Sequence, residues 1–350
     1  MNPDISAIVV NYRTADLAAA CVASLREAFA TGGISGEILL VDCGSGQEEA
    51  AALSRIPCEA LLRLPENRGY SGGANAGLGR ARSGRLLVSN ADVLFSSDSL
   101  PPLLAAIERP QVGVAGPLCF WDAGEKVRMP PGYAPRLWRD WSQLSAGRWP
   151  SLDRPRFQSF ALSSLQLWRE GGRVDHLTGA VLAARRDVFD RVGRFDERFP
   201  FEYEESEWED RLRRNGLELS YVVASRVRHL YGRAAGRDPS TAARRAESRD
   251  RYRRSRYGSV GALLLEQAGR RRSRVDATPL PRPAIARSPG MRLAISPNPS
   301  LLPFADASLE EDFLLPEDVL PSLPPGPLYL RVFSETDGAP RATYVWEKAA

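Results

Sequence analysis

Short apolar runs alternate with amphipathic segments through the first 115 residues of the chain. Aliphatic and β-branched residues dominate positions 5–12, 37–42 and 85–89, and runs of this length and composition predict buried strands. Between the first two runs, apolar residues recur every four positions from Leu17 to Phe29, which predicts one face of an α-helix. The pattern therefore begins as strand, helix, strand.

The same alternation continues to residue 115. It predicts helices at 48–54, 75–82 and 100–108 and strands at 60–64 and 112–115. Strands separated by helices form parallel sheets with crossover helices, so the predicted fold class is α/β with a doubly wound sheet. Ligands of such sheets collect at the carboxyl ends of the strands, where this chain carries Asn11, Asp42 and Asp92.

Residues 119–175 break this rhythm. They hold five of the seven tryptophans, together with many arginines and several prolines. A long irregular stretch rich in aromatic residues predicts either a functional loop on the acceptor side of a site or a small aromatic core of its own. The sequence favours neither interpretation over the other.

Three parts are expected along the chain. Strand and helix signals resume at 174–185 and 204–223, so the α/β domain is predicted to span residues 1–258. A basic and proline-rich linker is predicted at 259–299. Residues 300–350 alternate apolar and polar positions and predict a small β-rich appendage, whose role the sequence does not indicate.

Composition narrows the class of protein. The chain has 350 residues, 43% of them hydrophobic, which is enough for a packed core. No apolar run approaches the 18 to 20 or so residues that span a bilayer, and the first residues lack the features of a signal peptide. The four cysteines show no C-x-x-C spacing, so buried reduced thiols and a cytoplasmic location are expected. With only two histidines, a His-rich metal site is excluded.

The net charge of +4 hides an uneven distribution. Residues 244–274 carry eleven arginines against three acidic residues, which is 11 − 3 = +8, so the rest of the chain sums to −4. This basic segment predicts either an amphipathic helix with a solvated arginine face or peripheral contact with acidic lipid headgroups at the inner face of a membrane. No aromatic-interleaved motif accompanies it, so a nucleic-acid partner is not expected.

Candidate chemistry gathers around Asp92. It follows an apolar strand, and a Gly/Asn-rich loop at 66–77 lies shortly upstream. A carboxylate at a strand end beside such a loop can hold a divalent cation against a diphosphate. An acidic cluster at 202–210 can supply a base. Together they suggest transfer of a group from a nucleotide-diphosphate donor.

Seven motifs in this order resemble the family 2 glycosyltransferases, most closely the rhamnosyltransferase-like branch. They are Val9–Tyr12, Val41–Ser45, Glu66–Asn75, Asn90–Asp92, Leu177–Ala180, Gly193–Phe199 and Glu204–Arg211. The resemblance covers roughly residues 5–258. It implies a GT-A fold, Mg²⁺ or Mn²⁺, and inverting transfer of a sugar from a nucleotide-sugar to a hydroxyl. It implies dTDP-rhamnose or a UDP-sugar as donor and a saccharide, lipid-linked or other hydroxyl acceptor, in surface polysaccharide or glycoconjugate synthesis.

The resemblance also implies roles for residues on the donor side. Asp92 occupies the place of the metal-binding motif, and His229 that of a further metal ligand or phosphate contact, although a core histidine is the alternative. The implied donor-binding residues are Asn11, Tyr12, Asp42, Arg68, Gly69, Gly73, Asn75, Asn90 and Ala91. Among these, Asp42 would contact the base or ribose, and Arg68 a phosphate.

On the acceptor side, the resemblance places the general base at Glu205, the second member of an acidic pair. The family usually has Asp there, so Glu204 or Glu207 remain alternatives. A helix N-terminus stabilises negative charge, which predicts a low pKa for the base. Thr178, Gly179 and Trp208 are expected to line the acceptor side, and Glu209 and Asp210 to lie on a solvated face. His176 is expected to have little role.

The sequence leaves two alternative functions, a sugar nucleotidylyltransferase and a catalytically degenerate binding module. A sugar nucleotidylyltransferase would need a Gly-rich loop with Arg and Lys directly after the first strand, where this chain reads Asn11-Tyr12-Arg13-Thr14. The only support for a catalytically degenerate binding module is Glu205, which stands where the family usually has Asp.

Overall fold

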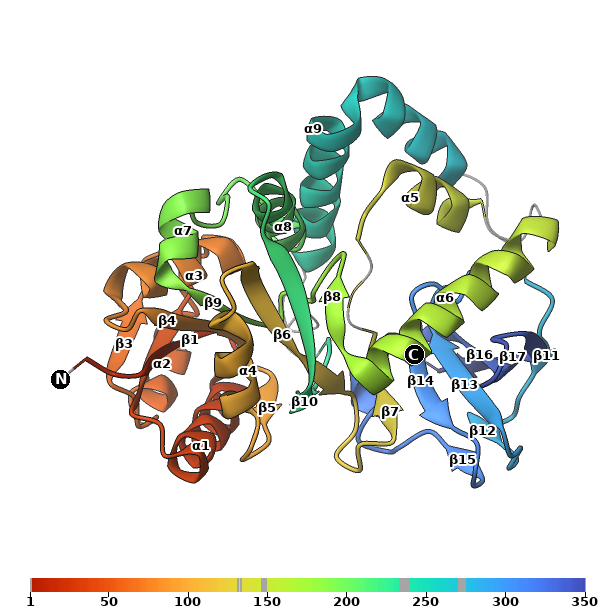
Figure 1. Ribbon diagram of the computed structural model, residues 1–350, viewed down its shortest axis with the longest axis horizontal. Coiled ribbons are helices and arrows are strands. Elements are labelled where there is room, and N and C mark those ends of the chain that lie inside the picture. Colours follow the sequence, from red (N-terminus) through yellow and green to blue (C-terminus); the bar gives the residue numbers. More distant parts are fainter. Residues whose placement is uncertain are drawn as a thin grey trace. The chain divides into compact units, whose positions relative to one another are not determined.

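The computed structural model describes residues 2–130, 132, 134–145, 150–232, 240–269 and 275–349. The chain divides into two compact units (Figure 1). The first consists of Met1–Leu118 and Gly171–Tyr252, and the second of Cys119–Glu170 and Arg253–Ala350. The expected boundaries at 258 and 299 do not coincide with this division, because residues 119–170 group with the C-terminal part of the chain.

The first unit is built on parallel strands in the order β3-β2-β1-β4. Their bounds are β1 Ile5–Asn11, β2 Gly36–Asp42, β3 Ala60–Arg63 and β4 Arg85–Asn90. All seven residues of β1 are buried, so helices and loops cover both faces of the sheet there. The predicted α/β class with a GT-A-type sheet is confirmed, and the strands lie where the apolar runs predicted them.

Beyond β4 the strand pairing becomes antiparallel. β9 pairs antiparallel with β4 and with β6, while β10 pairs antiparallel with β5 and β8. Their bounds are β5 Val93–Phe95, β6 Val112–Phe120, β8 Gly172–Val174, β9 Val181–Arg185 and β10 Glu218–His229. The sheet is therefore mixed: β9 lies antiparallel between β4 and β6, and β6 runs in the same direction as β4.

Six helices of the described chain lie wholly within the first unit. They are α1 Ala15–Gly32, α2 Gln47–Leu53, α3 Gly69–Arg80, α4 Leu100–Ile107, α7 Arg186–Val192 and α8 Glu204–Arg214. Most agree with the predicted positions, but α3 begins at Gly69 rather than near Asn75. Its glycines allow the helix to lie against the sheet, since a Cβ on Gly73 would come within 2.6 Å of Cys43 Sγ and one on Gly77 would overlap Ile8.

The second unit is centred on a sheet in the order β11-β17-β16-β13-β14-β7. Its strands are β7 Val127–Arg128, β11 Thr278–Pro279, β13 Met291–Ser296, β14 Ala305–Ser308, β16 Gly326–Ser334 and β17 Pro340–Lys348. A separate pair joins β12 (Ala284–Ile285) to β15 (Phe313–Leu314), and a 3-10 turn, η2, spans Leu320–Ser322. The β-rich appendage is confirmed. The expected linker, however, contains the almost fully buried strand β13, because its prolines flank that strand instead of interrupting it.

Helices occupy the region that was expected to be irregular. α5 (Leu137–Leu144) and α6 (Pro150–Glu170) lie within it, and Trp149 falls outside the described residues. Phe157 of α6 is fully buried and stacks on Phe304, with ring centroids 5.3 Å apart, and Trp168 is buried beside the same ring. An aromatic core therefore accounts for part of the Trp-rich segment, whereas Trp138 is largely exposed.

A buried ion cluster joins three strands of the second unit. The Asp306 carboxylate is inaccessible to solvent and accepts hydrogen bonds from the guanidinium groups of Arg128 and Arg292. The two arginines stabilise this buried charge. Loss of either arginine would leave the charge poorly compensated and would strongly destabilise the fold.

The helix α9 (Thr241–Gly269) carries the described part of the basic segment, and residues 270–274 lie outside the described chain. Gly258 has left-handed backbone (φ 69°) and interrupts the helix. Of the helices that the structure describes, none combines the length and the hydropathy needed to cross a bilayer.

Candidate active site

The site is built at the carboxyl ends of the parallel strands in the first unit. Asn11 at the end of β1 lies opposite Asp42 at the end of β2, and the Asn11 amide donates to Asp42 Oδ1 over 3.3 Å. Ser45 donates to the same oxygen through its backbone N–H and its hydroxyl. Within the described chain, Oδ2 of Asp42 accepts no hydrogen bond, so one carboxylate oxygen is fixed by the protein and the other is left for a ligand.

A strained turn follows β1. Arg13 has positive φ (56°), its N–H donates to Ser45 Oγ over 2.8 Å, and its guanidinium lies 5.1 Å from the centre of the Tyr12 ring. Thr14 donates to Asn11 Oδ1 over 2.8 Å. These contacts fix Asn11 beside Asp42 and hold the turn that carries Tyr12.

Asp92 and His229 come together although 137 positions separate them in sequence. β5 pairs with β10 so that His229 lies opposite Val93, and Leu230 N–H donates to the Asp92 carbonyl over 2.9 Å. This register places His229 Nε2 3.3 Å from Asp92 Oδ1, and both side chains are buried. Within the described ranges, no three His, Cys, Asp or Glu side chains form a cluster that could hold a metal by itself.

The predicted donor loop is largely engaged with the turn at 193–199. Arg68 forms an ion pair with Glu197, and the Asn75 amide donates to the Phe195 carbonyl over 2.9 Å. Gly69 has positive φ (74°), and a Cβ there would lie 2.5 Å from the Pro200 carbonyl oxygen. Arg68, Gly69 and Asn75 thus fix the turn that leads into α8.

The segment at 178–180 connects the Asp92 turn with α8. Asn90 N–H donates to the Ala180 carbonyl over 2.9 Å, and Tyr70 Oη donates to the Gly179 carbonyl over 2.8 Å. A Cβ on Gly179 would lie 3.4 Å from Cβ of Glu205, so the absence of a side chain lets this backbone approach the acidic pair.

The two carboxyl groups heading α8 lie in different environments. Glu204 is buried, and its Oε2 has no hydrogen-bond partner within the described chain. Burial and the neighbouring Glu205 raise the pKa of Glu204 well above its usual range. Burial also raises the pKa of Glu205, to about 7, although the charge of His176 opposes this rise. The low pKa expected from the helix N-terminus was wrong, because desolvation outweighs it.

His176 is the site residue that sequence reasoning undervalued. Its Nδ1 contacts Glu209 Oε2, and its Nε2 lies 3.8 Å from Glu205 Oε1. Burial disfavours the imidazolium and Arg213 opposes it, yet Glu209 and Glu205 together raise the pKa of His176 above its ordinary value. A cation is thus held against the side chain of the proposed base.

Glu209 and Asp210 were expected on a solvated face, and that expectation was wrong. The Glu209 side chain is inaccessible to solvent, and its Oε1 accepts from Leu177 N–H over 2.8 Å. Asp210 accepts from Tyr252 Oη over 3.0 Å. The spacing of Glu205 and Glu209 was a usable signal, because residues four apart lie on the same helix face.

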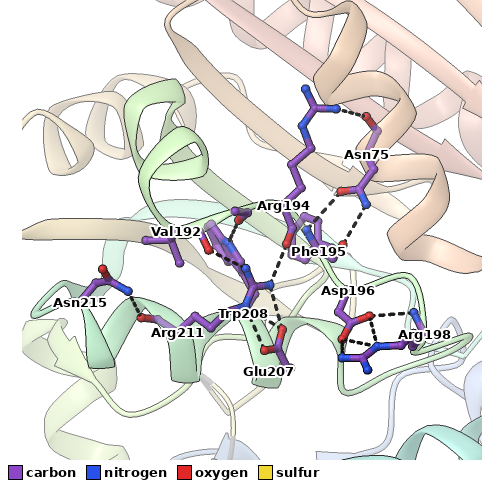
Figure 2. A network of polar contacts seen from close by, with 11 residues as sticks. Asn75, Val192, Arg194, Phe195, Asp196, Arg198, Glu207, Trp208, Arg211 and Asn215 are labelled. Carbon is purple, nitrogen blue, oxygen red and sulfur yellow. Dashed lines mark hydrogen bonds and ion pairs between the residues drawn. The ribbon is translucent and has the colours of Figure 1, made fainter.

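The remaining residues of α8 anchor the helix (Figure 2). Both oxygens of Glu207 accept from Arg211 Nε over 2.9 Å, which commits that carboxylate to a structural pair. The same guanidinium donates to the carbonyls of Val192 and Arg194. Trp208 is fully buried, stacks on Phe189 and donates to the Gly193 carbonyl over 2.9 Å. Its ring therefore lies in the core and offers no surface to an acceptor.

Comparison with known proteins identifies the family of the chain. Residues 6–193 match the sequence profile of Glycosyl transferase family 2. Over 218 residues the chain is 31% identical to an N-acetylglucosaminyl-diphospho-decaprenol L-rhamnosyltransferase of Mycobacterium tuberculosis, covering 58% of this chain and 69% of that protein. Over 159 residues it is 33% identical to the succinoglycan biosynthesis protein ExoO of Rhizobium meliloti, covering 44% and 42% of the two chains.

A solved structure also resembles the chain. It is the mannosyltransferase PcManGT from Pyrobaculum calidifontis in complex with GDP-Man and Mn²⁺, at 15% identity and a TM-score of 0.47. The alignment covers 77% of this chain and 74% of that one, and the likeness is too weak to support a conclusion.

Proposed function

Since the chain belongs to glycosyl transferase family 2, we propose that it moves a sugar with inversion from a nucleotide-diphosphate donor to a hydroxyl of a lipid-linked saccharide. The rhamnosyltransferase relative makes dTDP-rhamnose the first donor to test, and a UDP-sugar the second. The observation that carries the proposal is Glu205, a largely buried carboxyl whose side chain is 15% exposed, with a pKa of about 7, that lies beside Gly179 and His176. Membership of a family of glycosyl transferases, which transfer sugars, argues against a sugar nucleotidylyltransferase, which transfers a nucleotidyl group.

Glu205 is proposed as the general base. A carboxylate that titrates near neutral pH is ionised in an ample fraction of molecules and still takes up a proton readily. In the reaction, its carboxylate accepts the proton of the acceptor hydroxyl as that oxygen forms the new glycosidic bond. The raised pKa of Glu204 favours its protonated form, and Glu207 is paired with Arg211, so both are poorer candidates for the role.

His176 and Glu209 are proposed to position and tune this base. The His176 cation, held by Glu209, favours the ionised form of Glu205 before the acceptor arrives. Without it, burial would leave Glu205 protonated at neutral pH. His176 acts through Glu205 and is therefore a positioning residue.

Asp92 and His229 fit a divalent cation. A buried carboxylate oxygen and an imidazole nitrogen 3.3 Å apart are a donor pair of the kind that Mn²⁺ accepts, and Mg²⁺ takes the carboxylate. The diphosphate would complete the coordination, since these two residues do not make a closed protein site. A bound Mg²⁺ or Mn²⁺ would offset the negative charge of the departing nucleotide.

The nucleoside is proposed to lie at the ends of β1 and β2. Asn11 and Ser45 fix one oxygen of Asp42, which orients the other toward a ribose hydroxyl or a base N–H. Tyr12 and Arg13 form the adjoining stacked pair. Arg68, Gly69, Gly73 and Asn75 support this site through the helix α3 and the turn at 193–199, and Asn90 and Ala91 carry Asp92.

Peripheral contact with an anionic membrane at its cytoplasmic face is proposed for α9. Val260, Leu263 and Leu264 are spaced as one helix face, and Val260 is 74% exposed. They follow the arginine-rich first half of the helix, and this combination suits an anionic lipid surface. Replacing all three with serine should abolish co-sedimentation with anionic vesicles, whereas serine at the exposed Leu314 should not. Equal binding by both variants would contradict the proposal.

Two measurements test the enzymatic proposal. Nucleotide binding should raise the melting temperature with dTDP or UDP in the presence of Mn²⁺, and Asp92→Ala should abolish this shift. Glu205→Gln should reduce kcat by about 10²–10⁴-fold with the donor shift intact, whereas Glu27→Gln on the exposed face of α1 should not. Retained turnover in Glu205→Gln would refute the base assignment.

A further inference from the structure

The second unit contains a cavity of about 650 Å³ that none of the functions above uses. Its walls come from α6, the loop at 299–302, and the strands β16 and β17. This volume lies within the range of pockets that hold small ligands. All of its lining residues belong to the second unit, so the cavity is a property of that unit alone.

The lining is strongly cationic. The four arginines that line the cavity are Arg154, Arg156, Arg331 and Arg341. Asp153 and Asp276 are the acidic residues of the wall, so the excess is 4 − 2 = +2. Thr343 and Ser300 add hydroxyl groups, and the rest of the wall is apolar. Such a wall suits a ligand that is both negatively charged and polyhydroxylated.

Arg331 has no carboxylate partner within the described chain. Arg331 donates to Thr343 Oγ1 over 2.9 Å and lies 4.7 Å from the centre of the Phe157 ring, and no carboxylate within the described chain forms an ion pair with it. Burial lowers the pKa of Arg331 to about 10, with Asp153 giving only partial compensation. A cation that has lost water without gaining a carboxylate in an ion pair is a site that an anion would stabilise.

Arg156 gives a second, independent sign. Its Nη1 lies 3.1 Å from Asp153 Oδ1, but its Nη2 is buried and has no hydrogen-bond partner among the described residues. Buried guanidinium donors are normally satisfied, so an unfilled donor at the wall of a cavity points to a missing acceptor. Arg341 contacts Asp337 only at 3.9 Å and is half-exposed, which leaves its charge available.

We propose that this cavity binds the oxyanion of a phosphorylated or carboxylated saccharide, as a second ligand site apart from the transfer site of the first unit. Arginine is the side chain best suited to this role, because its planar fork pairs with two oxygens of one phosphate or carboxylate. The hydroxyls of Thr343 and Ser300 would contact the sugar. The second unit would thus bind a ligand separately from the first unit.

The test is calorimetric titration of the full chain with glucose 1-phosphate, glucuronate, inorganic phosphate and glucose. Either anionic sugar should bind and glucose should not, and the affinity should fall as NaCl is raised from 20 to 300 mM. Binding by glucose 1-phosphate and inorganic phosphate identifies a phosphate site, and binding by glucuronate alone identifies a carboxylate site. Absence of saturable binding by every anion, or equal binding of glucose, would overturn the proposal.

Arginine variants locate the site. Arg156→Gln and Arg341→Gln should each weaken binding about tenfold or more, whereas Arg282→Gln, exposed and outside the cavity, should not. Arg331→Lys keeps the charge but loses the fork, and it should weaken binding with an unchanged melting temperature. Asp92→Ala should bind as the unmodified chain does, which separates this site from the donor site. Equal loss in Arg282→Gln would refute the location.

Discussion

Replacing His176 with glutamine removes the cation that faces the proposed base. The charged side chains that act on Glu205 are His176, Glu209, Glu202 and the neighbouring Glu204, and its own backbone N–H also lowers its pKa. Of these side chains, His176 alone favours the ionised form of Glu205, and burial opposes it. The substitution should therefore raise the pKa of Glu205 above about 7 and move the acidic limb of the pH–rate profile to higher pH.

The magnitude follows from the separation of the two charges. His176 Nε2 lies 3.8 Å from Glu205 Oε1. Unit charges about 4 Å apart interact by about 1 kcal/mol in water and about 4 kcal/mol at an effective dielectric constant near 20. Since about 1.4 kcal/mol corresponds to one pKa unit, the expected rise is roughly one to three units. Even a one-unit rise lowers the ionised fraction at pH 7 from about one half to about one tenth, so kcat should fall about fivefold.

The assay is kcat against pH between about 5.5 and 9.5, for the unmodified chain, His176→Gln and a matched control, Arg80→Gln. Arg80 is exposed at the end of α3, and its loss should leave the profile unchanged. The His176→Gln enzyme should regain activity as pH rises. An acidic limb at the same midpoint, with kcat reduced equally at every pH, would refute the reasoning and assign His176 a purely structural role.

Stability needs its own control, because His176→Gln leaves the buried Glu209 charge without its partner. The double variant His176→Gln/Glu209→Gln removes that charge as well. The effect of His176 on Glu205 exceeds that of Glu209, so the acidic limb of the double variant should lie between those of the single variant and the unmodified chain.

Three further outcomes are expected. Glu204→Gln should leave kcat at pH 7 within about threefold of the unmodified value, because the raised pKa already keeps this carboxyl neutral; a loss like that of Glu205→Gln would reverse the two roles. Gly77→Ala should reduce the free energy of unfolding by about 1–3 kcal/mol, because the new Cβ would overlap Ile8. Gly84→Ala should not, because nothing lies within 4 Å of a Cβ at that position. Equal melting temperatures of the two variants would contradict this. Asp306→Ala should cost about 3–5 kcal/mol in denaturant unfolding because two arginines lose their shared carboxylate, and a cost below about 1 kcal/mol would show that the cluster is solvated.

The sequence predicted the positions of the strand ends well, because an apolar run that stops at a polar residue marks the edge of a parallel sheet. Asn11, Asp42 and Asp92 lie where that pattern placed them. The start of α3 was missed because glycine has a poor helix propensity, and only the close approach to Ile8 explains a helix there.

The errors at the site had a different origin. The prediction of a solvated Glu209 treats charge as a sign of exposure. A charged residue that is paired with a histidine can, however, be fully buried. The prediction of a low pKa for the base rested on the helix dipole alone. It left out desolvation, which raises the pKa of Glu205. Neither burial nor the partner of His176 can be derived from local sequence, because β8, β9 and α8 meet only in the folded chain.

The division of the second unit into two distant segments has a consequence for synthesis. Phe157 leaves the ribosome well before its partners Phe304 and Phe333, which follow about 150 and 175 residues later. At 5–20 residues per second, the aromatic face of α6 waits roughly 7 to 35 s for the strands that cover it. During that interval α6 presents apolar surface to the cell, so the nascent chain should depend on chaperones at this stage. Removing the C-terminal strands would make that exposure permanent.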